Sequence, residues 1–339
     1  RLRRLFRRPE AQPVSSGFQP ELTPWFDRFQ NLRLEEAGEL HRDFSAEVAG
    51  TRFPVTLRII DARDPAIRRD LVNEVGTSFA DGDIASVFEL AWHSYDDGRY
   101  VAILMEKLKA TFRREVLGKD VNSIPRETKL RLLGEILRGA KQVFERNFAP
   151  HNINPDSVAV VGDCTRDLSD CNTKLVGFGL TADVEKARQG ENGELGNIFY
   201  NAPEAWVTGG DLSKVDVWSM GRLAFELFVG DPMLRKGKDP KPYDIDLAGD
   251  KRFATLKKSD PAVANLIEKM LSKRAWLRPS IDAAYAMVED ILRKAGVDGV
   301  PEQPQVALPN EWYDTRRPKK GLVFGEAGRE VSARRSWGS

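Results

Sequence analysis

The sequence is poor in the residues that build metal sites and disulfide scaffolds. It has two cysteines, Cys164 and Cys171, and three widely separated histidines, His41, His93 and His151. These numbers exclude a disulfide-stapled scaffold and a cysteine-based zinc ribbon. They also argue against a histidine-rich metal site.

Two further features are absent. No run of 18 or more apolar residues occurs, so the sequence predicts no transmembrane helix. The chain also lacks an excess of charge of one sign, with 52 Lys and Arg against 51 Asp and Glu. Because nucleic-acid-binding proteins usually carry a basic excess, the composition argues against a nucleic-acid partner.

The rest of the composition is typical of a soluble globular protein. The chain has 339 residues, of which 41% are hydrophobic and 30% are charged. That length favours about two domains. We expect residues 1–20 to form a basic tail and linker and residues 301–339 to form a partly disordered C-terminal extension. Whether a signal peptide preceded Arg1 is left open.

The first eight residues, RLRRLFRR, form a short basic amphipathic pattern. Such a pattern could contact an anionic membrane if it is helical. The alternative is a solvated tail.

Two parts of different character lie between the ends. Residues 21–108 carry short strand-like segments punctuated by Gly and Pro, with one helical stretch and a hairpin signal at Asp97-Gly98. Residues 109–300 are dominated by apolar residues at helical spacing. The predicted helices there cover 129–146, 215–230, 264–272 and 281–296, and a small hairpin covers 157–161 and 173–178. The sequence therefore predicts a small β-rich part followed by a larger α-rich part.

Five fragments, in this order, resemble the protein-kinase fold. They are HNINPDSVAVV from residue 151, KLVGFGL from 174, NAPE from 201, KVDVWSMGRLAFELFVG from 214 and LSKRAWLRPS from 271. They are similar to the catalytic loop, the metal-binding strand, the APE motif, the long buried helix and the arginine-bearing segment of kinases. The resemblance implies an α+β, bilobal protein kinase-like fold, with a β-rich N-lobe over 21–108 and an α-helical C-lobe over 109–300.

The same resemblance identifies replaced residues at the positions that phosphoryl transfer needs. Asn152 replaces the catalytic Asp, Ser157 replaces the Asn that holds the second metal ion, and Gly177 replaces the metal-binding Asp. Arg58 replaces the lysine of the third strand, and the Gly-rich loop is reduced to Gly38. An amide does not take up a proton at neutral pH, and glycine has no side chain that could bind a metal. We therefore expect neither ATP nor Mg²⁺ to bind.

Residues that would stabilise the fold are retained. The resemblance implies a buried ion pair between Glu204 and Arg278, and a hydrogen bond to Asp216 from the catalytic-loop backbone. Glu74 is the candidate for the glutamate of the N-lobe helix, with Arg58 as its partner. We expect these residues to have structural roles.

Cys164 and Cys171 flank the turn between the two predicted strands of the second part. If these strands pair, the two sulfurs lie across a hairpin and could form a disulfide, which would imply the secretory pathway. The alternative is two free thiols in a reducing compartment.

The missing Gly-rich loop, the altered catalytic loop and the two cysteines together resemble the secreted kinases and pseudokinases of apicomplexan parasites, in particular the with-no-Gly-loop family. Members of that family are released into the parasitophorous vacuole and associate with its membranes or with the cyst wall. Active members keep Asp in both loops, so Asn152 and Gly177 separate this chain from them.

The leading prediction is a catalytically inactive, secreted pseudokinase that acts as a scaffold or allosteric partner of another protein in a vacuole or cyst wall. A second hypothesis is an enzyme with unorthodox nucleotide chemistry, carried by Arg58, His151, Asp156 and Asp183. A third is a membrane-associated module that docks through residues 1–8. The partner, any ligand of the cleft, the oligomeric state and the role of the C-terminal extension stay open.

Overall fold

The computed structural model describes two compact units. The residues that it describes are 27–37, 41–51, 53–64, 67, 71, 89–95, 99–107, 110–162, 164, 167–190, 195–207, 209–232, 241 and 243–302. Unit 1 comprises the described residues up to Lys107, and unit 2 comprises those from Ala110 onward. The predictions made for Glu74, for residues 1–8 and for residues 303–339 fall outside the described residues.

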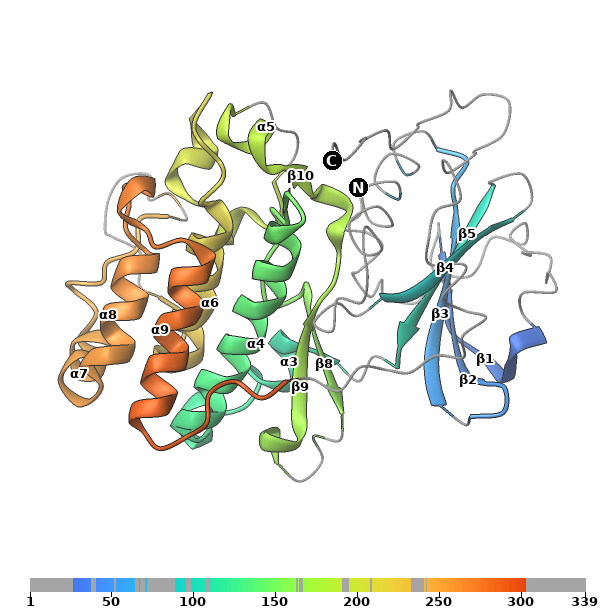
Figure 1. The fold of residues 1–339 in the computed structure, drawn as a ribbon, viewed down its shortest axis with the longest axis horizontal. Helices are drawn as coiled ribbons and strands as arrows, with labels where there is room; N and C mark the ends of the chain where they lie inside the picture. The colour runs from blue at the N-terminus through green and yellow to red at the C-terminus, as the bar shows by residue number, and fades with distance from the viewer. Residues whose placement is uncertain are drawn as a thin grey trace, which may run out of the picture. The chain divides into compact units, whose positions relative to one another are not determined.

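Unit 1 is built on a five-stranded antiparallel sheet, within the described residues, in the order β1-β2-β3-β5-β4 (Figure 1). Its strands are β1 (Phe29–Ala37), β2 (His41–Val48), β3 (Phe53–Asp61), β4 (Glu89–Tyr95) and β5 (Tyr100–Glu106). In β3, the side chains of Val55, Leu57 and Ile59 are fully buried in one apolar cluster. Because alternate residues of a strand face the same side, Arg58 lies on the opposite face of the sheet.

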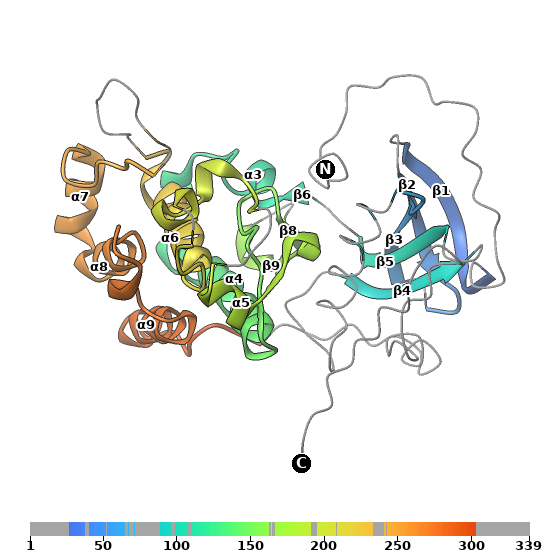
Figure 2. The same ribbon diagram turned by 90° about the horizontal axis from the view of Figure 1, so that it is seen from above.

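Unit 2 is mainly helical (Figures 1 and 2). Its helices are α3 (Phe112–Glu115), α4 (Arg126–Glu145), α5 (Val184–Arg188), α6 (Val215–Val229), α7 (Lys251–Ser259), α8 (Pro261–Met270) and α9 (Ile281–Lys294). Helix α6 contacts both α4 and α8 and is buried along almost its whole length. A helix that is buried on all sides has no polar face, which explains its nearly continuous apolar sequence. The predicted α+β fold class is confirmed. No helix in the part that the structure describes is long and apolar enough to cross a membrane.

Two helices begin earlier than the apolar periodicity predicted. Helix α4 begins at Arg126, directly after Pro125, and α8 begins at Pro261. Asp260 caps α8 by accepting a hydrogen bond from the Val263 N–H at 3.2 Å. In α8, Pro261 occupies the first helical position and Asp260 the cap, which these residue types favour, whereas periodicity detects only the first apolar residues.

A small sheet of unit 2 carries the two cysteines. Its strands are β6 (Ala110–Thr111), β8 (Val158–Gly162) and β9 (Cys171–Leu175), and β7 (Phe148–Ala149) pairs separately with β10 (Ala182–Asp183). A disulfide joins Cys164 to Cys171 across the β8–β9 hairpin. Arg131 of α4 donates hydrogen bonds of 2.7 Å to the carbonyl oxygens of Leu168 and Cys171. The disulfide-closed turn is thereby fixed to the longest described helix of unit 2.

Candidate functional site

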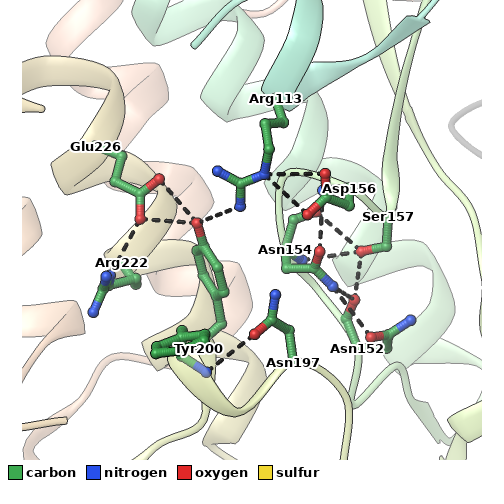
Figure 3. Close-up of polar contacts among 10 residues, drawn as sticks. Arg113, Asn152, Asn154, Asp156, Ser157, Asn197, Tyr200, Arg222 and Glu226 are labelled. Atoms are coloured by element: carbon green, nitrogen blue, oxygen red, sulfur yellow. Dashed lines mark hydrogen bonds and ion pairs between the residues drawn. The ribbon is translucent and has the colours of Figure 1, made fainter. Parts of the chain in front are cut away.

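The loop at 150–157, which resembles the kinase catalytic loop, is held together by its own side chains (Figure 3). The Asn154 amide donates to the carbonyl oxygen of Asn152 at 2.9 Å and to the Asn152 side-chain oxygen at 3.1 Å. The Ser157 hydroxyl donates to the Asn152 carbonyl and accepts the Asn154 N–H at 3.0 Å. Asn154 also accepts the Asp156 N–H at 3.0 Å. The polar side chains of this loop therefore bond mainly to the loop itself.

The Asn152 side chain also ties this loop to the segment around Gly177. Its amide nitrogen donates to the Gly177 carbonyl at 3.3 Å. Gly177 has a φ of 82°, a left-handed conformation that glycine adopts without steric cost. It precedes the 3-10 helix Phe178–Leu180, in which Phe178 is buried in the core of unit 2. On its other side Asn152 lies against Gly196, where an added Cβ would stand 2.1 Å from the Asn152 side-chain oxygen.

His151 and Asp216 meet beneath the loop. His151 has a φ of 56°, and its backbone N–H bonds to the Asp216 carboxylate on α6. Burial raises the pKa of Asp216 to about 7, although this hydrogen bond opposes the shift. Burial lowers the pKa of His151 to about 4, although the Leu212 carbonyl opposes that shift. His151 is therefore uncharged at neutral pH and buried, as expected for a histidine that packs in the protein interior.

Arg113 of α3 connects the loop to a second group of polar residues (Figure 3). Its Nε lies 3.0 Å and 2.9 Å from the two carboxylate oxygens of Asp156. Its Nη2 donates to the Tyr200 hydroxyl at 3.1 Å. Its backbone N–H donates to the Pro155 carbonyl at 3.0 Å. Arg113 thus holds the loop from both its side chain and its main chain.

Tyr200 links Arg113 to helix α6. The Tyr200 hydroxyl lies 2.8 Å and 2.9 Å from the Glu226 carboxylate oxygens, and Arg222 Nε donates to the same carboxylate at 3.2 Å. All three side chains are buried, and burial raises the pKa of both Tyr200 and Glu226. Hydrogen bonds are stronger in such a low-dielectric environment, so the network fixes the 3-10 helix Ile198–Tyr200 against α6.

The structure pairs Glu204 with Arg278. Two guanidinium nitrogens of Arg278 lie 2.5 Å and 2.8 Å from the two Glu204 carboxylate oxygens. Arg278 also donates to the carbonyls of Ser272 and Lys214, and its side chain is fully buried. This bidentate geometry suits a guanidinium better than an ammonium group.

Asp183, one of the residues of the hypothesis of unorthodox nucleotide chemistry, is engaged in local structure. Its carboxylate caps α5 by accepting the N–H groups of Glu185 and Lys186 at 2.9 Å and 3.3 Å. It also accepts from the Asn147 amide at 3.1 Å. Over the residues that the structure describes, no group of three or more His, Cys, Asp and Glu side chains is arranged to hold a metal ion.

In unit 1, Arg58 forms a buried ion pair across two strands. Its Nε and Nη2 donate to the two carboxylate oxygens of Asp43 on β2, at 2.8 Å and 2.5 Å. Asp43 and Arg58 are direct partners in the β2–β3 register. Burial, together with the nearby charge of Arg58, lowers the pKa of His41 to about 4. The sequence pointed to Glu74 as the partner of Arg58 and did not indicate Asp43.

These groups differ from those that phosphoryl transfer needs. The reaction uses a carboxylate beside the substrate hydroxyl and oxygen ligands for Mg²⁺. Asn152 offers a neutral amide whose N–H groups point to a carbonyl oxygen, and the Ser157 hydroxyl bonds to the Asn152 backbone. Gly177 offers no side chain. At these three described positions, Asn152, Ser157 and Gly177 therefore supply no carboxylate to accept a proton or to bind Mg²⁺.

Comparison with known proteins identifies the class to which this arrangement belongs. The family model of the protein kinase domain matches residues 84–288. This match covers more than half of the 339 residues. The chain belongs to the protein kinase domain family, as the order of its motifs predicted.

Individual relatives are distant. A probable serine/threonine-protein kinase of Dictyostelium discoideum is 20% identical over 306 residues, which are 80% of this chain and 66% of that protein. A membrane-associated tyrosine- and threonine-specific cdc2-inhibitory kinase of Drosophila melanogaster is 30% identical over 197 residues, which are 55% of this chain and 34% of that protein. The chain thus spans less than two thirds of the length of these relatives.

The network through Arg113, Tyr200 and Glu226 was missed at the sequence level. Its two hydrogen-bonded pairs, Arg113 with Tyr200 and Tyr200 with Glu226, are 87 and 26 positions apart in the sequence and belong to different helices and turns. The available signal was Glu226, a carboxylate in a predominantly apolar helix, because a buried charge needs a partner. That signal predicts a partner for Glu226 without saying which residue it is.

Proposed function

We propose that this chain is a pseudokinase that binds another protein and does not transfer phosphate. The observation that carries the proposal is the hydrogen bonding of Asn152. At the position of the catalytic carboxylate, it presents an amide that donates to Gly177 and accepts from Asn154. A proton acceptor for a substrate hydroxyl is therefore missing at that position, and losing a general base typically costs about 10² to 10⁴ in rate.

The loop at 150–157 lacks the residues of phosphoryl transfer, whereas the interactions that stabilise the fold around it are present. This combination favours a binding role. The buried pair Glu204–Arg278 and the contact between Asp216 and the loop backbone are in place. These interactions stabilise a folded domain without taking part in chemistry. A stable domain with such a loop can serve as a scaffold or as an allosteric partner.

We further propose that the protein is secreted and related to the with-no-Gly-loop family of apicomplexan parasites, whose bradyzoite pseudokinase it resembles. The disulfide between Cys164 and Cys171 supports an oxidising compartment, since disulfides persist there and are rare in the cytosol. Its place would then be the parasitophorous vacuole or the cyst wall.

Two measurements on the full chain test this function. The first is thermal unfolding with ATP, ADP and GTP, each with and without Mg²⁺ or Mn²⁺. A nucleotide at 100 times its Kd would stabilise the folded state by about 2.7 kcal/mol, a rise of several degrees, and we expect no rise. The second is transfer of labelled phosphate to generic protein substrates, with Arg58→Ala as the matched variant. Transfer by the wild type that Arg58→Ala abolishes would refute the proposal.

A further inference from the structure

Four large apolar side chains of unit 2 are exposed on two short turns. Trp206 and Val207 are 45% and 64% exposed, at the end of the 3-10 helix Pro203–Trp206. Trp276 and Leu277 are 74% and 58% exposed, on the 3-10 helix Ala275–Leu277. Scattered apolar residues are common on protein surfaces, but contiguous ones usually mark an interaction site.

These two turns are neighbours in the fold. The Val207 N–H donates to the Glu204 carbonyl at 3.2 Å, and the Glu204 side chain binds Arg278, the residue after Leu277. The Leu277 N–H in turn donates to the Arg274 carbonyl at 3.0 Å. We give the name tryptophan face to the exposed side chains of these two linked turns, which are Trp206, Val207, Lys273, Arg274, Trp276 and Leu277.

Among the residues that the structure describes, the tryptophan face carries one unpaired cation, Arg274. Residues 269–278 contain four cationic side chains and no carboxylate. Two of these cations are neutralised, because Lys273 binds Asp244 at 2.7 Å and Arg278 binds Glu204. Arg274 lies over the Trp276 ring, 5.7 Å from its centroid, and no carboxylate of the described residues forms an ion pair with it. Arg274 thus brings an uncompensated charge to an apolar surface.

The face is also fixed in place before any partner arrives. The Glu204–Arg278 pair joins the two turns below the surface, and the Trp206 ring lies 6.0 Å from the Tyr243 ring. A surface that is already ordered loses little conformational entropy on binding.

We propose that the tryptophan face binds a segment of a partner protein that combines apolar side chains with carboxylates. The inference rests on the proposed function, which requires a protein partner. Tryptophan and arginine are the residue types that most often dominate binding energy at interfaces. A carboxylate of the partner would neutralise the unpaired Arg274. Apolar side chains of the partner would pack on Trp276 and Leu277.

Two other occupants fit less well. A second copy joined about a two-fold axis would bring the same cationic segment of each chain together, and like charges facing each other oppose association. Lipid recognition by charge usually uses about 4–8 clustered Lys and Arg, whereas two cations of segment 269–278 are already paired.

The test is a selection from a random peptide library displayed on phage, with the full chain as the target. The double variant Trp276→Ser/Leu277→Ser serves for counter-selection. We expect the recovered peptides to be net acidic and to contain aromatic or aliphatic residues. A synthetic peptide from the selection should bind Trp276→Ser and Arg274→Glu at least tenfold more weakly than the wild type. Replacing its carboxylates by lysine should restore binding to Arg274→Glu.

The matched control is Leu34→Ser, which removes a side chain of 55% exposure in unit 1 and should bind like the wild type. Each variant is first checked by thermal unfolding, which should be unchanged because the replaced side chains are exposed. Equal binding by all variants, recovery of basic peptides only, or no recovery would overturn the proposal. So would a dimer in sedimentation, or binding to phosphatidylserine vesicles, that Trp276→Ser abolishes. Phosphate transfer is assayed on the same preparations, because its presence would refute the pseudokinase proposal and leave the peptide result unaffected.

Discussion

Removal of the Glu204 carboxylate measures how far unit 2 depends on its buried ion pair. Glu204→Ala leaves Arg278 with the carbonyls of Ser272 and Lys214 and the Trp218 ring, but without a counter-charge. Removing one partner of a buried pair costs about 3–5 kcal/mol. Each kcal/mol lowers the Tm of a domain of about 150–250 residues by about 2–4 °C. We therefore expect the Tm to fall by about 6–20 °C.

The assay is thermal and urea unfolding of the full chain, followed by circular dichroism. The matched control is Glu185→Ala, which breaks an ion pair to Arg188 with the same 2.5 Å separation but with side chains that are 61% and 53% exposed. That control should lose less than about 1 kcal/mol. The double variant Glu204→Ala/Arg278→Met removes both charges and should lose less than the two single variants added together. If Glu204→Ala is no less stable than Glu185→Ala, burial does not determine the strength of these pairs and the reasoning is refuted.

Three further predictions use the same unfolding assay. Burial lowers the pKa of His151 from 6.5 to about 4. The free energy of unfolding is therefore unaffected by this group above pH 6.5 and falls by up to about 3 kcal/mol as the pH approaches 4, because the unfolded chain takes up the proton first. His151→Gln should flatten that part of the pH profile, and an unchanged slope would contradict the assignment. Replacing Cys164 and Cys171 by Ala opens a turn of 7 residues and should lower the free energy of unfolding by about 2 kcal/mol, as should reduction of the wild type. Tyr200→Phe removes one of the two described donors to the buried Glu226 carboxylate, leaving only Arg222, and should cost about 1–3 kcal/mol. Asp156→Asn at a half-exposed pair should cost less than about 1 kcal/mol. The reverse order would show that the buried part of the network is not the stronger one.

The replaced residues at the kinase motif positions could be found from the sequence, because each lies a few residues from a recognisable neighbour. Asn152 and Ser157 follow from their distance to Pro155, and Gly177 follows from its place between a short apolar strand and Phe178. The burial of helix α6 follows from its composition in the same way. Such statements need no knowledge of how distant parts of the chain meet.

Partners across the fold could not be found in this way. Tyr200 and Arg113 are 87 positions apart, and only the packing of unit 2 brings their polar groups within 3.1 Å. The pairing of Asp43 with Arg58 depends on the register of β2 on β3. A shift of one residue would move Asp43 to the other face of the sheet. The sequence also lacks the repeated glycines of a Gly-rich loop, which would have marked that register.

The hydrogen bonds of Asn152 predict that Asn152→Asp alone would not restore a usable proton acceptor to the loop. Its amide nitrogen donates to the Gly177 carbonyl, and its side-chain oxygen accepts from Asn154. In Asn152→Asp, an ionised oxygen would replace the donor and face a carbonyl oxygen, so two acceptors would oppose each other. Gly196 lies against this side chain, since a Cβ at that position would stand 2.1 Å from the Asn152 side-chain oxygen. Leaving that carbonyl without its donor costs about 1–3 kcal/mol. The arrangement that satisfies the polar groups of this loop is therefore the same one that removes its proton acceptor.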